Sequence, residues 1–156
     1  MPPEPTSQSS RCFAFERDLI GNWRCIPLCL RRKLDLAGIK LRLTHWLTLD
    51  QAQRQELVLW PDGPDDLRAM ADHIRALTRP MAEGEARDLP PVFAEPWQGA
   101  AAAPEPVLQA AAALGKPLSL AEWHGLGELE RFALCKLARP GHDHHNLPAA
   151  LLEVLD

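Results

Sequence analysis

Apolar residues recur at helical spacing along most of the chain. In the segment 27–38, Leu30, Leu34 and Ala37 stand three or four positions apart, as on one face of a helix. Pro27 suits the start of that helix, and Gly38 suits the left-handed position that ends it. The pattern therefore predicts a first helix between these two residues.

The same kind of signal predicts five more helices. Asp50 and Gln53 form a potential capping box that opens a helix to about residue 59, and Gly63 with Pro64 opens another that Pro80 stops. Further helices are expected at about 105–114, 128–138 and from Leu147 onward. Segments 39–43 and 118–123 are interpreted as short extended connectors that pass into helical turns. No longer strand is expected, so the predicted fold class is all-α.

The chain also repeats itself with a displacement of 77 positions. The recurring pairs are Leu30 and Val107, Gly38 and Gly115, Leu41 and Leu118, Leu43 and Leu120, Trp46 and Trp123, Leu49 and Leu126, Arg54 and Arg131, and Leu57 and Leu134. Leucine matches are common by chance, so the glycine, tryptophan and arginine pairs carry the inference. The repeat predicts two similar helical units packed around one core in a single compact domain, 11–156, because two copies are too few for a solenoid.

A proline-rich segment separates the predicted units. Repeat unit one is expected at about 26–79 and repeat unit two at about 106–156, with a linker at about 80–105 between them. The stretch 80–106 holds six prolines and few periodic apolar positions. Phe93 and Trp97 are expected to anchor it to the core.

Charge is distributed unevenly. The chain has a net charge of −4, yet residues 1–54 hold nine basic and five acidic residues, and the remainder holds eight and sixteen. An acidic C-terminal two-thirds argues against general nucleic-acid binding. A basic N-terminal third permits a patch directed at an acidic partner or an anionic ligand.

The N-terminus has neither the basic start nor the apolar run of a signal peptide, and no run of eighteen apolar residues follows. We expect a cytoplasmic protein with no membrane association and with residues 1–10 disordered. Its cysteines are then expected as thiols, at Cys12, Cys25, Cys29 and Cys135.

Basic residues are dense around the first helix. Six cations fall within nineteen residues: Arg24, Arg31, Arg32, Lys33, Lys40 and Arg42. Asp35 stands four positions after Arg31 and can pair with only one of them. We interpret these residues as exposed and as a candidate docking or anion-binding surface, with an ordinary solvated face as the alternative. Arg54 and Arg131 are interpreted as structural, with guanidinium groups that bind helix-end carbonyls or a carboxylate.

Cysteine and histidine offer a second candidate chemistry. Cys25 and Cys29 lie at a helix start, where a thiol pKa can fall, but their spacing fits neither a redox motif nor a zinc site, so packing is favoured. A metal could bind the His-rich stretch through His142, His144 and His145, with Cys135 nearby in sequence. A solvated turn is favoured there, and no cofactor is expected. The alternative function is a small metal- or thiol-dependent enzyme that uses this loop with Cys25 or Cys135.

Two blocks of sequence resemble the nitrate-reductase-associated protein family. The first comprises Arg24–Pro27, Arg31, Lys33–Asp35, Gly38–Leu41 and Trp46, and the second comprises Trp123, Arg131–Leu134, Lys136, Leu137, Arg139, Pro140, His142 and Asn146. Together they cover about half of the chain, whereas 80–105 contributes little. Cys29 and Leu30 replace aliphatic positions of the family pattern.

The resemblance implies an accessory or maturation role in nitrate assimilation. Members of that family are small bacterial proteins encoded beside genes for assimilatory nitrate reductase and molybdopterin synthesis. The implied partners are nitrate reductase or the proteins that deliver its molybdenum cofactor, and binding rather than catalysis is implied. His142 joins the candidate binding residues because it belongs to the second block.

Overall fold

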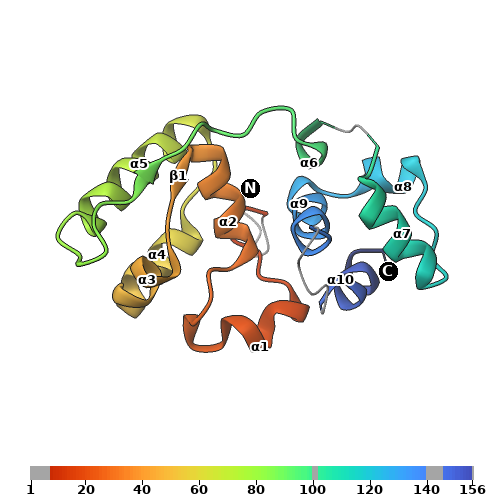
Figure 1. Ribbon diagram of the computed structural model, residues 1–156, viewed down its shortest axis with the longest axis horizontal. Helices are drawn as coiled ribbons and strands as arrows, with labels where there is room; N and C mark the ends of the chain where they lie inside the picture. The colour runs from red at the N-terminus through yellow and green to blue at the C-terminus, as the bar shows by residue number, and fades with distance from the viewer. Residues whose placement is uncertain (1–7, 100–101, 140–145, 156) are drawn as a thin grey trace, which may run out of the picture. The chain divides into compact units, whose positions relative to one another are not determined.

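The computed structural model describes residues 8–99, 102–139 and 146–155. The described chain is mostly helical, which agrees with the predicted class (Figure 1). It divides into two compact units. Unit 1 holds the described residues up to Cys12 together with Arg17–Val92, and unit 2 holds Phe13–Glu16 together with the described residues from Phe93 onward.

Unit 1 is built around the predicted first helix. Its elements are α1 (Arg17–Ile20), η2 (Gly21–Trp23), α2 (Leu28–Ala37), β1 (Ile39–Lys40), α3 (Leu43–Thr48), α4 (Gln51–Leu59), α5 (Pro64–Thr78) and β2 (Arg87–Asp88). Helix α2 packs on α5 and α4. Asp50 and Gln53 exchange the two hydrogen bonds of the predicted capping box at the start of α4.

A two-residue antiparallel ladder follows α2. Gly38 ends the helix at φ 74°, and β1 then pairs with β2 so that Ile39 faces Asp88. A side chain at Gly38 would place its Cβ 2.5 Å from the carbonyl oxygen of Leu89. Glycine is therefore required there both by the left-handed backbone and by the close approach of the chain that follows β2.

Unit 2 has its own core. Its elements are η1 (Ala14–Glu16), α6 (Pro96–Gly99), α7 (Glu105–Ala113), α8 (Leu120–Gly125), α9 (Glu128–Leu137) and α10 (Leu147–Leu155). Helix α9 packs on α6 and α10, and α10 packs on α7 and η1. The apolar centre comprises Val107, Ala111, Trp123, Leu134, Leu147, Ala150 and Leu151.

Several sequence predictions need correction. The extended connector predicted for 39–43 is shorter than expected, because β1 covers only Ile39–Lys40 and α3 begins at Leu43, whose side chain is 51% exposed. Phe93 was expected in the core and is 89% exposed, whereas Trp97 is buried as expected. The disorder predicted for residues 1–10 falls mainly on 1–7, which lie outside the described residues.

The helix bounds fall at matching positions in the two units. Helices α3 and α8 begin and end 77 positions apart, and α4 and α9 begin 77 positions apart. Gly38 and Gly115 both have positive φ, at 74° and 75°. These facts are compatible with duplication, which itself stays a prediction.

Candidate functional site

The cations predicted to form a surface fall into two classes. Arg24, Arg31, Lys40 and Arg42 are exposed. Arg32 and Lys33 are buried, with 4% and 0% of their surface accessible. We call the first four residues the exposed cations; they lie within one continuous stretch of unit 1.

The buried position of Lys33 contradicts the prediction from the sequence, in which this residue is exposed. Its ammonium donates three hydrogen bonds to backbone carbonyls, at 2.9 Å to Leu57, 2.7 Å to Val58 and 2.8 Å to Trp60. These carbonyls lie at and just after the C-terminal end of α4, where helix carbonyls lack intrahelical partners. Lys33 therefore fastens α2 to the end of α4 and is not part of a docking surface.

Burial lowers the pKa of Lys33 from 10.5 to about 8. The charged form thus loses more by desolvation than it regains from neighbouring groups, among which Cys29 and Asp62 raise the pKa. Arg32, one residue earlier, is held by an ion pair with Asp62 at 2.9 Å. Both buried cations are consequently used inside unit 1.

The lowered pKa of Lys33 predicts an unusual dependence of stability on pH. Between about pH 8 and pH 10.5 the unfolded chain binds more protons at Lys33 than the folded chain does, so this residue makes stability rise with pH. We expect the difference in unfolding free energy between the parent and Lys33→Met to grow in favour of the parent by about 3 kcal/mol across this window. Denaturant titrations of both proteins from pH 7 to 10.5 measure it, because all other titrating groups are shared. A difference that stays constant with pH would show that the Lys33 pKa is ordinary.

Arg42 and its surroundings position the start of α3. The guanidinium lies 3.5 Å from Glu83, and the Thr44 hydroxyl also donates to that carboxylate. The hydrogen bond from Thr44 lowers the pKa of Glu83, and Arg42 and His45 lower it further. Glu83 belongs to the loop that follows α5, so this loop and α3 are joined by charge and by hydrogen bonds.

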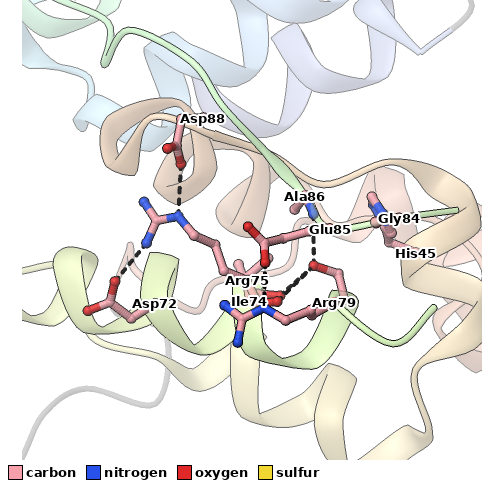
Figure 2. Close-up of polar contacts among 10 residues, drawn as sticks. His45, Asp72, Ile74, Arg75, Arg79, Gly84, Glu85, Ala86 and Asp88 are labelled. Atoms are coloured by element: carbon pink, nitrogen blue, oxygen red, sulfur yellow. Dashed lines mark hydrogen bonds and ion pairs between the residues drawn. The ribbon is translucent and has the colours of Figure 1, made fainter.

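His45 completes that connection from inside the fold. Its Nδ1 accepts the backbone N–H of Arg42 at 3.1 Å, so Nε2 carries the proton and donates to the carbonyl of Gly84 at 2.7 Å. Figure 2 shows His45 beside Gly84. The role of His45 could not be predicted from the sequence, because a single histidine within a short helical turn belongs to no recognisable pattern.

The loop after α5 is held by further polar contacts. Arg75 donates to Asp72 at 2.6 Å and to Asp88 at 2.9 Å, and Arg79 donates to Glu85 at 2.6 Å (Figure 2). The Thr78 hydroxyl accepts the backbone N–H of Ala86 at 2.8 Å. The loop is thus fixed to α5 at several points and gives α3 a firm support.

The remaining candidates lie elsewhere. Asp35 is half-buried on α2, and its backbone carbonyl accepts the N–H of Val92 at 3.2 Å. His142, His144 and His145 lie outside the described residues, so the geometry of the histidine loop is not described. Among the residues that the structure describes, no three histidine, cysteine or acidic side chains gather in a way that could hold a metal ion.

Cys135 does not have an activated thiol. Burial, followed by the carboxylate of Glu95, raises the pKa of the Cys135 thiol to about 12. The thiol is therefore protonated near neutral pH and is a poor nucleophile. Cys29 is fully buried in unit 1, as the packing interpretation expects, and Cys25 is half-buried.

Arg54 and Arg131 have the structural contacts predicted for them. Arg54 donates to the carbonyls of Trp46 and Leu47, both at 2.9 Å. Arg131 donates to the carbonyl of Trp97 at 3.0 Å and to that of Leu126. Each guanidinium therefore binds backbone carbonyls within its own unit and is not a free ligand-binding group.

Within the described part of the chain, every helix is too short or too polar to cross a lipid bilayer.

Comparison with known proteins identifies one protein family. Searches of curated proteins and of solved structures find no match to the chain. The family of conserved nitrate reductase-associated proteins matches residues 12–154, and the chain belongs to that family.

Proposed function

We propose that this protein is a non-catalytic accessory factor that binds assimilatory nitrate reductase through the exposed cations of unit 1. Membership of the nitrate reductase-associated family supports the choice of partner. The observation that carries the choice of surface is the exposure of Arg24, Arg31, Lys40 and Arg42 within nineteen residues of a chain whose net charge is −4.

Charge explains why this stretch is favoured. Arg32 and Lys33 are buried and bonded to groups inside unit 1, so the charge that this stretch offers to a partner comes from the exposed cations. Arg31 uses its Nε to donate to the carbonyl of Ile26 at 3.2 Å, which orients a guanidinium that is still exposed. An acidic protein surface would be attracted over roughly one Debye length, about 8 Å at physiological salt.

Two partner proteins are compatible with this proposal. Nitrate reductase itself is the primary partner, and a protein that delivers the anionic molybdenum cofactor is the alternative. Both would respond to positive charge, so binding has to be measured with each purified protein separately. Maturation of the enzyme would follow if association precedes insertion of the cofactor.

We also propose that the two units are copies of one ancestral unit. Equivalent positions of unit 2 can then serve as controls for substitutions in unit 1. The matching bounds of α3 and α8 and the positive φ of Gly38 and Gly115 support the correspondence. On that correspondence Lys40 and Arg42 match Pro117 and Ser119 in unit 2, which carry no charge. The positive charge is thus specific to unit 1.

Charge reversal tests the proposed surface. The double variant Arg31→Glu with Lys40→Glu should bind purified nitrate reductase at least about tenfold more weakly at low salt, because attraction is replaced by repulsion. Association should slow, and the dependence of Kd on salt should flatten. Biolayer interferometry at several salt concentrations measures all three quantities.

A matched control separates this surface from net charge. Arg68→Glu with Arg17→Glu makes the same charge change at two exposed arginines, on α5 and α1, that take no part in the contacts that support α3. It should leave binding near the parent value, and both double variants should keep unfolding free energies within about 0.5 kcal/mol per substitution. Equal binding by the parent and by Arg31→Glu with Lys40→Glu would reject the exposed cations as the docking surface.

A further inference from the structure

The outward side of α3 exposes two leucines. Leu43 and Leu47 are 51% and 50% exposed, and they stand four positions apart, so they share one side of the helix. The other side of the same helix holds His45 and Trp46, which are 2% and 0% exposed. We call Leu43 and Leu47 the leucine face.

Positive charge adjoins the leucine face. Arg42 immediately precedes α3, and Lys40 is the exposed residue of β1, next to the buried Ile39. Isolated surface leucines are ordinary, but a pair beside exposed charges resembles the centre of an interface with a polar rim. The arrangement points to a partner with apolar side chains surrounded by carboxylates.

The side chain of Arg42 contributes an ion pair with Glu83 to the fold but does not cap α3. It occupies the N-cap position, where an acceptor side chain is preferred, and a guanidinium has no acceptor. A cation is also unfavourable at the positive end of a helix. At the start of α8, the matching Ser119 accepts the N–H of Glu122 at 3.0 Å and caps the helix normally. The exposed ion pair with Glu83 contributes little to stability, so a residue that breaks the capping rule for so small a gain points to a use in binding.

The helix that bears the leucines is firmly held. His45 joins α3 to Gly84, and Thr44 and Arg42 join it to Glu83, as described above. The loop that contains both partners is itself tied to α5 (Figure 2). A surface that is already ordered loses little conformational entropy when a partner binds.

From these observations we propose that the leucine face, with Lys40 and Arg42, binds an acidic amphipathic segment of the partner protein. Apolar side chains of that segment cover Leu43 and Leu47, and its carboxylates meet the two cations. The proposal deepens the proposed function, on which it rests for the identity of the partner as nitrate reductase.

Three variants of the full chain test it against purified nitrate reductase. Leu43→Ser with Leu47→Ser should raise Kd at least about tenfold, because two apolar anchors are lost, while Tm stays near the parent value. Arg42→Ser should weaken binding and reduce its salt dependence, yet keep Tm near the parent value or above it, because the cap that is gained offsets the exposed ion pair with Glu83 that is lost. Leu120→Ser is the matched control, since Leu120 is 56% exposed at the corresponding position of α8, and it should bind like the parent.

A second probe separates the leucine face from the identity of the partner. Two synthetic amphipathic helical peptides, with leucines four positions apart and flanked by glutamates in one and by lysines in the other, are titrated into the ¹⁵N-labelled chain. The acidic peptide should shift the amide signals of α3, and the basic peptide should not.

The outcomes are distinct. If nitrate reductase fails to bind the parent but the acidic peptide binds at α3, the proposed function is wrong and the leucine face stands. If Leu43→Ser with Leu47→Ser binds the enzyme or the acidic peptide as the parent does, the leucine face is overturned. It is also overturned if neither probe binds the parent, or if the basic peptide binds at α3 equally well.

Discussion

Replacing Lys33 by methionine is expected to lower the free energy of unfolding by about 3 kcal/mol at pH 7. Methionine fills a similar volume, so the loss comes from the carbonyls of Leu57, Val58 and Trp60, which lose the ammonium donor. The Leu57 carbonyl still accepts the N–H of Trp60 at 3.2 Å, so the buried Val58 carbonyl and the partly buried Trp60 carbonyl account for most of the cost. An unsatisfied buried polar group costs about 1 to 3 kcal/mol. Relief of the desolvation that lowers the Lys33 pKa offsets part of this cost. Urea titration followed by circular dichroism measures the change.

Lys40→Met provides the comparison for that experiment. Lys40 is exposed on β1, so the same chemical change should alter the unfolding free energy by no more than about 0.5 kcal/mol. A Lys33→Met variant as stable as the parent would mean that the end of α4 does not depend on this ammonium.

Truncation of Trp46 to alanine is expected to cost about 3 to 5 kcal/mol, the range for losing a large buried aromatic side chain. Trp46 is fully buried, and its ring lies 5.8 Å from the guanidinium carbon of Arg54. Its indole N–H donates to the carbonyl of Trp23 at 2.6 Å, and Trp23 itself has the unusual φ of 57°. Loss of the indole would therefore remove the shorter hydrogen bond to the Trp23 carbonyl and the aromatic ring beside Arg54, whose bonds to backbone carbonyls remain. Chemical denaturation checks the value, and a change near zero would contradict the buried position.

Phenylalanine at the same site isolates the hydrogen bond from the volume. Trp46→Phe removes the shorter of two hydrogen bonds to the Trp23 carbonyl, the other coming from Arg54 Nη1 at 3.3 Å, whereas the buried Nε1 of Trp123 has no hydrogen-bond partner among the described residues. We therefore expect Trp46→Phe to be more destabilising than Trp123→Phe by about 1 kcal/mol. Equal effects would show that Arg54 alone satisfies the Trp23 carbonyl.

Helix ends were predicted well wherever a local chemical rule governs them. Gly38 ends α2 in the left-handed conformation, and Asp50 with Gln53 opens α4, both through interactions between residues a few positions apart. The structural role of Arg54 could likewise be predicted, because a long cationic side chain on an inward helix has few other ways to be satisfied.

The candidate surface was predicted only in part, because burial depends on contacts between distant segments. Residues 30, 33, 34 and 37 share one helical stripe, and this signal could have placed Lys33 inside. The carbonyls that receive its charge lie more than twenty positions away and have no sequence signature. His45 and Glu83 are joined to α3 in the same nonlocal way, through a loop that sequence reasoning treated as an irregular linker.

The path of the chain limits how the protein can be divided. Phe13–Glu16 belongs to unit 2, although the residues on both sides of it belong to unit 1. Within unit 2, the carboxylate of Glu153 accepts the backbone N–H groups of Ala14 and Phe15, both at 3.0 Å. A cut after Val92 would therefore separate the C-terminal fragment from the N-terminal segment that binds its last helix. The two halves cannot be exchanged between relatives by a single crossover, and an isolated unit 2 would need this N-terminal peptide supplied in trans or grafted by circular permutation.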